Sequence, residues 1–127
     1  MADAVASQTI IDGDKNVVMK FTNISDGTGE SAVAKVDVSA LNGAPSRVRI
    51  MKIHAATAGM GVDLLWDATT DVLAWHVPAD TQMTWDFTYH GGLPNNAGAG
   101  ITGDIMFTTI GHTAADRYSL VIEMKKD

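Results

Sequence analysis

Cysteine is absent from this 127-residue chain, and its absence removes several kinds of chemistry at once. Without cysteine there is no disulfide framework, no thiol nucleophile and no zinc–thiolate site. The absence suits a protein made in a reducing cytoplasm. No apolar run approaches the length that a helix needs to span a bilayer, so we expect no membrane contact. The first residues lack the basic start and apolar core of a secretory signal.

Charged residues are also scarce, at 19% of the chain, and basic residues are the smaller part of them. Nine basic against fifteen acidic residues leave a net charge of −6. Because a nucleic-acid binder draws its affinity from neutralising phosphates, we expect no nucleic-acid partner. The one basic cluster, Arg47, Arg49 and Lys52, is interpreted as the solvated face of a strand. With 46% hydrophobic residues, residues 1–127 are expected to form a single globular domain.

The most informative stretch is residues 62–77, in which two apolar runs flank the polar segment 67–71 and each run carries a tryptophan. Val, Leu and Trp favour strands, whereas Asp and Thr favour turns. We therefore predict a β-hairpin that needs further strands over its apolar face. Alternation predicts the inward sets Val62, Leu64 and Trp66 on the first arm, and Leu73, Trp75 and Val77 on the second.

Turn signals recur through the rest of the chain, and no stretch has a sustained 3.6-residue apolar stripe. The pattern is typical of an all-β fold, a single antiparallel β-sandwich or jelly-roll-like domain of about eight strands. The stretch 81–89 shows the cleanest alternation, with Met83, Trp85, Phe87 and Tyr89 on one face. The other predicted strands are 17–23, 32–41, 47–56, 104–110 and 117–124. Their order in the sheets cannot be derived from the sequence.

Two segments fall outside the strand pattern. Residues 1–9 are small and polar, and we expect an N-terminal arm that becomes ordered against a partner. Residues 91–100 form a loop rich in glycine. It is not a phosphate-binding loop, because no lysine follows it and no helix pattern begins after it. Long loops of this kind are usually functional or mobile.

The sequence offers two candidate metal sites, and both lack the ligands that a metal would need. Asp12, Asp14 and Asn16 are spaced like the start of a calcium loop, but Val17 and Asn23 occupy its glycine and glutamate positions. A plain turn explains the segment better. The four histidines have no paired-ligand spacing. We therefore expect no metal and no cofactor at His54, His76, His90 and His112.

Catalytic candidates are equally weak. The aspartates Asp63, Asp67, Asp71 and Asp86 could offer a carboxylate pair for glycoside hydrolysis. Strand alternation explains them more simply as the polar face of the hairpin and of its neighbour. No Gly-x-Ser-x-Gly elbow is present. We expect no enzyme and assign no catalytic residue.

The three tryptophans, Trp66, Trp75 and Trp85, could stack on sugar rings if they were exposed. Each lies in phase with apolar neighbours, which favours burial in the core or at a subunit interface. The two interpretations are distinguishable. A sugar-binding module should expose at least two coplanar aromatic rings, whereas a purely structural protein should bury them.

Several segments of the chain carry a likeness to one known family. In the second half they are residues 62–68 (VDLLWDA), 91–98 (GGLPNNAG), 103–105 (GDI) and 107–109 (FTT). Residues 22–30 (TNISDGTGE) and 35–38 (KVDV) add to them from the N-terminal half. Together these segments span about 100 residues, and none of them is a catalytic motif. They resemble small virion proteins encoded near the capsid gene of tailed bacteriophages, particularly marine ones.

The resemblance implies a structural role, with a capsid decoration (cement) protein on the outer surface of the head as the first expectation. Its partner would then be the major capsid protein, and it would form a homo-oligomer. It would be made in the host cytoplasm and located in the virion. A tail, collar or fibre component is the alternative in the same setting. A carbohydrate-binding β-sandwich module is the alternative from another class.

Overall fold

A computed structural model describes residues 4–24, 33–43, 45–95, 98, 100, 102–111, 113 and 115–126. Within these ranges the chain forms nine strands, two short 3₁₀ turns and no α-helix. The strands are β1 (Ala4–Asp12), β2 (Asn16–Ile24), β3 (Val33–Val36), β4 (Val48–Ala58), β5 (Gly61–Trp66), β6 (Val72–Val77), β7 (Gln82–Asp86), β8 (Ile105–Ile110) and β9 (Arg117–Lys126). The turns are η1 (Val38–Ala40) and η2 (Thr88–His90). No helix in the described ranges has the length and hydropathy that crossing a bilayer requires.

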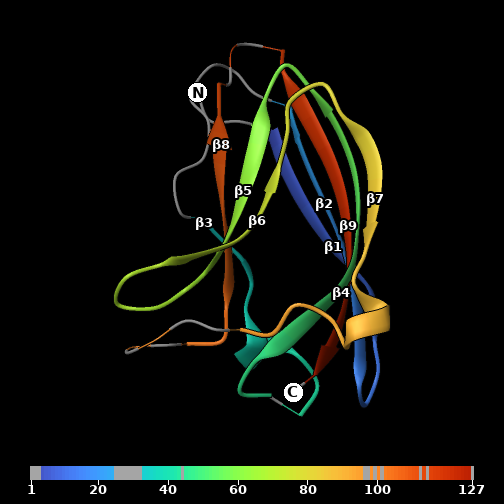
Figure 1. Cartoon of the computed structure of the whole chain (residues 1–127), viewed down its shortest axis with the longest axis vertical. Helices are drawn as coiled ribbons and strands as arrows, with labels where there is room; N and C mark the ends of the chain where they lie inside the picture. The colour runs from blue at the N-terminus through green and yellow to red at the C-terminus, as the bar shows by residue number, and fades with distance from the viewer. Residues whose placement is uncertain are drawn as a thin grey trace.

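The strands form two antiparallel sheets that face each other across the core (Figure 1). The five-stranded sheet has the order β1-β2-β9-β4-β7, and the four-stranded sheet has the order β3-β8-β5-β6. Eight of the strands, β2 to β9, have the order of a jelly roll, and β1 is added outside β2. The prediction of an antiparallel β-sandwich is confirmed.

Aromatic side chains from both sheets meet in the core. Phe21 of β2 packs edge-to-face on Phe107 of β8, with ring centroids 5.1 Å apart. Phe107 in turn contacts Tyr118 of β9 at 5.9 Å. Such pairs contribute roughly 0.5–1.5 kcal/mol beyond the burial of their area. They connect the middle strands of one sheet to the other sheet.

The predicted hairpin is present, but the inward face of its second arm is partly wrong. Leu64 pairs with Trp75 and Leu65 with Leu73, so Ala74 is an extra residue in β6. Such a bulge reverses the alternation of side chains on one side of it. Trp75 and Val77 face inward as predicted, but Leu73 is 54% exposed and Val72 packs against the core in its place.

A second bulge explains why apolar residues occupy both alternating sets of positions in β4. Ile50 pairs with Met124 and Lys52 with Glu123, which leaves Met51 as the extra residue. Val48 and Ile50 are buried before the bulge, and Ile53 and Ala55 after it. The bulge shifts the inward-facing positions of this inner strand by one residue, and this shift produces the mixed pattern.

The N-terminal segment is a strand rather than a separate arm. Residues 4–9 belong to β1 and pair with β2 of the same chain, from Ala4 opposite Ile24 to Thr9 opposite Met19. The segment thus obtains backbone hydrogen bonds without a partner. The described side chains of residues 6–11 are all exposed, so pairing in β1 rests on the backbone. Residues 1–3 lie outside the described ranges.

Strand β7 ends earlier than the alternation of residues 81–89 predicts. The Asp86 carboxylate accepts hydrogen bonds from the Thr88 backbone N–H at 2.9 Å and from its hydroxyl at 2.6 Å. These bonds turn the chain into η2. Phe87 is buried and Trp85 packs against the core as predicted, but Met83 is 53% exposed and Tyr89 is 87% exposed.

Candidate functional site

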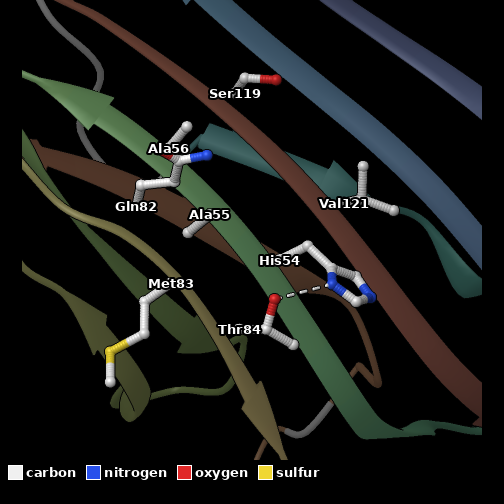
Figure 2. Close-up of a pocket in the computed structure, with 8 residues that line it drawn as sticks. All are labelled: His54, Ala55, Ala56, Gln82, Met83, Thr84, Ser119 and Val121. Carbon is white, nitrogen blue, oxygen red and sulfur yellow. Dashed lines mark hydrogen bonds between the residues drawn. The ribbon is translucent and has the colours of Figure 1, made fainter.

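The outer face of the five-stranded sheet carries a groove across β4, β7 and β9, which we call the sheet groove (Figure 2). Its volume is about 490 Å³. Ala56 stands in register between Gln82 of β7 and Ser119 of β9. Because Ala56 and Ser119 are small, the centre of this face is hollow. The lining residues are His54, Ala55, Ala56, Gln82, Met83, Thr84, Ser119 and Val121.

A polar chain crosses one side of the sheet groove. The His54 Nε2 atom lies 2.6 Å from Glu123 Oε2. Its Nδ1 atom lies 3.1 Å from Thr84 Oγ1 (Figure 2). A carboxylate can only accept, so Nε2–H donates to Glu123. In the neutral ring, Nδ1 then accepts the hydroxyl proton of Thr84. Thr84 lies directly opposite His54 in the β4–β7 register, so the ladder itself brings the two together.

The order hydroxyl, imidazole, carboxylate is that of a hydrolase triad. Acyl transfer also needs rigid donors for the developing oxyanion in a site that excludes water. The His54 and Glu123 side chains are 40% and 39% exposed, so water screens this arrangement. The sheet groove is therefore suited to hydrogen bonding with a polar ligand, and we assign it no reaction.

The other predicted histidines are not gathered with His54. His76 of β6 lies with its Nδ1 atom 2.6 Å from Asp63 Oδ1 on the neighbouring strand β5. The side chain of His90 and the whole of His112 lie outside the description. In the part of the chain that the structure describes, no three His, Asp or Glu side chains are placed to hold a metal ion.

Each of the four candidate aspartates has a different partner. Asp63 contacts His76, and Asp67 accepts from the Thr102 hydroxyl at 2.8 Å. Asp71 accepts from the Ala68 backbone N–H at 3.1 Å, within the β5–β6 turn. The hydrogen bonds from Thr88 to Asp86 lower the pKa of that carboxyl, with a smaller contribution from Lys52. These contacts give the four aspartates structural roles at strands and turns.

The sequence did not indicate that Asp104, which lies just before β8, is a partly buried carboxylate. Its Oδ1 atom accepts the Val38 backbone N–H at 3.0 Å. Partial burial raises the pKa of Asp104, against the lowering effect of this hydrogen bond, and the charges of Asp37 and Asp67 raise it further. The three aspartates are far apart in the sequence, and no local motif marks their proximity.

The segment with calcium-like spacing is a turn between β1 and β2. The Gly13 backbone N–H donates to the Asn16 carbonyl at 2.9 Å. The Asp12 carboxylate is occupied by the Lys126 ammonium, with Nζ 2.7 Å from Oδ1. This hydrogen bond, followed by that from the Asn42 backbone N–H, lowers the pKa of Asp12.

The first part of the glycine-rich loop is held against the sandwich. Leu93 and Ile50 exchange two backbone hydrogen bonds, at 2.8 and 3.1 Å. Gly92 donates to the Phe87 carbonyl at 2.9 Å, and Asn95 is buried. Residues 96, 97, 99 and 101 lie outside the described ranges.

The tryptophans do not form an exposed flat surface. Trp66 is fully buried, and Trp75 and Trp85 are partly buried against the core. Trp75 meets Trp85 at 66° and Phe87 at 70°, both edge-to-face. All eight aromatic residues of the chain are described, and Tyr89 is the one exposed ring among them.

No protein-family model matches this chain, and no curated protein matches it. Among solved structures, a cupin superfamily protein from Desulfitobacterium hafniense is similar at 9% identity, with a TM-score of 0.41, over 100% of this chain and 82% of that one. A cupin domain from Bordetella pertussis Tohama I is similar at 11% identity and a TM-score of 0.39, over 100% of this chain and 97% of that one. A structure described as "CBM4 structure and function" has 11% identity and a TM-score of 0.34, over 97% of this chain and 94% of that one. Similarities this weak say nothing about what the present chain binds.

Proposed function

We propose that this chain is a structural protein of a tailed-bacteriophage virion, a capsid decoration protein bound to the outer surface of the head. The proposal begins from the sequence resemblance and rests on one structural observation. All four edge strands of the described sandwich expose a large apolar side chain. These residues are Ile10 and Ile11 on β1, Met83 on β7, Val33 on β3 and Leu73 on β6.

Exposed edges of this kind favour assembly. Natural sandwiches limit pairing at their edges with charged residues, prolines, β-bulges or covering loops, because open backbone groups invite pairing. Register shifts lie in the edge pairings of β1, β3 and β6, so these edges offer apolar side chains for contact rather than a regular ladder. Apolar side chains on an open edge add area that a partner can bury. A decoration protein binds a surface that repeats many times, so weak contacts can suffice if several act together. The proposed partners are the major capsid protein and further copies of this chain.

The packing of the tryptophans supports this role over sugar binding. A sugar-binding module that uses tryptophan needs coplanar exposed rings, whereas Trp75 and Trp85 meet edge-to-face and are partly buried. Within the virion, a place in the tail, collar or fibre is the alternative to the head.

The proposal is tested by reconstitution. Heads from a phage that lacks this gene are mixed with the purified chain, washed and analysed for bound protein and for heat resistance. We expect saturable binding and a higher temperature of head disruption. If the heads bind none of the chain, decoration of the head is wrong, and tails from the same phage become the next substrate to test.

Carbohydrate binding is a second candidate, favoured by one observation. The sheet groove presents the side chains of His54, Gln82, Thr84 and Ser119, which can bond to sugar hydroxyls. Titration calorimetry with soluble oligosaccharides tests it. Binding that is lost in Gln82→Ala but kept in Gln8→Ala, another exposed glutamine in the same sheet, would support this function.

A further inference from the structure

Four apolar side chains form a row across the outer face of the four-stranded sheet, which we call the apolar row. Leu65 of β5 is the register partner of Leu73 of β6 on one side and of Met106 of β8 on the other. Met106 in turn pairs with Ala34 of β3. Leu64, the neighbour of Leu65, is buried in the core, so the apolar row points away from it. None of the four residues is buried, and Leu73 is 54% exposed.

Four aspartates lie beside the apolar row, at the same end of the four strands. The Asp67 backbone N–H donates to the Asp104 carbonyl at 3.1 Å, which extends the β5–β8 ladder. Asp67 is two residues beyond Leu65, so the two rows are about 7 Å apart and share the outer face. Each aspartate adjoins a strand residue that packs in or against the core. We call these residues the acidic row: Asp37, Asp67, Asp71 and Asp104.

The charge of this face has one sign. Apart from His76, the charged side chains within the four strands are Lys35 and Asp63. Asp63 lies 2.6 Å from His76, and Lys35 has an interaction within the chain. One ammonium against four carboxylates leaves the acidic row negative. The outer face of the five-stranded sheet instead carries both signs, with Lys20, Lys52 and Glu123 among its side chains.

A cation would stabilise the acidic row. Partial burial raises the pKa of Asp104, against the lowering effect of the hydrogen bond from Val38, and the charges of Asp37 and Asp67 raise it further. A nearby positive charge relieves such repulsion between carboxylates. Among the described residues, no three His, Asp or Glu side chains are placed to hold a metal ion. The cation that suits this row is therefore a lysine or arginine side chain.

We propose that the apolar row and the acidic row together dock a basic amphipathic segment of a protein partner. Apolar side chains of the segment pack on the leucines and on Met106, and its basic side chains lie over the acidic row. The rows cross four strands, a length of about 14 Å that matches about ten residues of an α-helix. A second copy of this chain suits the face less well, because each copy has a net charge of −6. The inference rests on the proposed function and names the chemistry of the shell segment that this face holds.

Fluorescence anisotropy with a labelled peptide of leucine and lysine tests this inference. The peptide is about 12 residues long and carries its leucines on one helical face. At low ionic strength we expect saturable binding that weakens as salt is added. A peptide of the same pattern with glutamate in place of lysine should not bind.

The apolar row is tested with Leu73→Thr, which removes apolar area at an exposed strand position. Binding of the leucine–lysine peptide should weaken about fivefold at every salt concentration. Ile10→Thr is the matched control, because Ile10 is 49% exposed on an edge strand of the other sheet. It should leave the affinity unchanged.

The acidic row is tested with the double variant Asp37→Asn/Asp71→Asn. Asparagine keeps the oxygens that accept backbone hydrogen bonds at these two positions. Peptide binding should weaken about fivefold at low ionic strength, and this difference should fade as salt is added. Asp80→Asn/Asp116→Asn is the matched control, since it removes the same charge beside Gly59, at the other end of β5. It should leave the affinity unchanged.

Three results would overturn the inference. They are absence of binding of the leucine–lysine peptide, equal binding of the glutamate peptide, and unchanged affinity in either the Leu73 variant or the double variant. A thermal melt checks that each variant is folded, and Asp71→Asn alone replaces the double variant if that protein is unfolded. A chain that binds phage heads but not the peptide refutes the docking face and keeps the proposed function. A chain that binds the peptide as expected but not the heads keeps the docking face and refutes the function.

Discussion

The side chain of Lys126 connects three segments at one end of the sandwich. Its ammonium donates to the Asp12 carboxylate at 2.7 Å, to the Gly13 carbonyl at 2.5 Å and to the Asn42 carbonyl at 2.7 Å. An ammonium has three N–H donors, and here each has an acceptor. The end of strand β9 is thereby held to the β1–β2 turn and to the segment that follows η1.

Replacing Lys126 with methionine should lower the melting temperature at neutral pH, because Asp12 then loses its cation. The effect should depend on pH. The lowered pKa of Asp12 means that its contribution is present above the unfolded value, near 3.8, and is lost as the pH falls through the lower folded value. Thermal melts of the wild type and Lys126→Met should therefore differ more at pH 7 than in strong acid, where only the hydrogen bonds to the Gly13 and Asn42 carbonyls still separate the two proteins. An equal difference at every pH would contradict this role of the pair.

The charge of Asp104 should affect stability in the opposite direction from that of Asp12 as the pH changes. Partial burial raises its pKa, so its charged form costs stability at neutral pH and this cost disappears as the group is protonated. Asparagine keeps an oxygen that accepts the Val38 N–H and removes the charge. We expect Asp104→Asn to melt at a higher temperature than the wild type at pH 7, with no difference well below pH 3.8. A lower melting temperature at pH 7 would show that the carboxylate is required.

At the scale of elements, the bulge in β6 decides which leucines contribute to the core. Leu64 of β5 is fully buried, whereas Leu73 of β6 is 54% exposed. We expect Leu64→Ala to cost about 2–5 kcal/mol of unfolding free energy, and Leu73→Ala less than about 1 kcal/mol. Urea denaturation of the two variants measures both values. Equal costs would mean that β6 keeps a regular alternation and that the bulge is absent.

The hairpin and most strands could be predicted from the sequence because their signals are local. Asp67 to Asp71 mark the turn, and Val62, Leu64 and Trp66 alternate without interruption. Bulges leave no such signal, so Leu73 was placed on the wrong face. Residues 4–9 lack the apolar pattern of a strand because pairing with β2 rests on their backbone.

The sheet groove could not be predicted from the sequence for a different reason. His54 and Glu123 are 69 positions apart, and the pairing of β4 with β9 brings them together. The order of strands in a sheet depends on long-range pairing, which no local pattern encodes. The sequence does place Arg47, Arg49 and Lys52 in one cluster, but in the structure Arg47 reaches the Asn95 carbonyl and Lys52 lies near Asp86.

At the scale of the whole molecule, the edge of the five-stranded sheet at β1 offers the longest open strand for assembly. Ile10 and Ile11 are 49% and 52% exposed on it. Lysines on an edge strand oppose pairing between chains. The double variant Ile10→Lys/Ile11→Lys should therefore bind poorly to heads that lack the chain, while its melting temperature stays close to that of the wild type. Unchanged binding would exclude this edge as the contact, and Leu73 on β6 would be the next site to substitute.

The central claim, that this chain decorates the outer surface of a phage head, is tested most directly by electron cryomicroscopy of purified particles. Maps of particles with and without the gene for this chain are subtracted from each other. We predict difference density on the outside of the shell, repeated with its symmetry and fitted by the nine-stranded sandwich. Density confined to the tail, or particles that contain none of the chain, would contradict the claim.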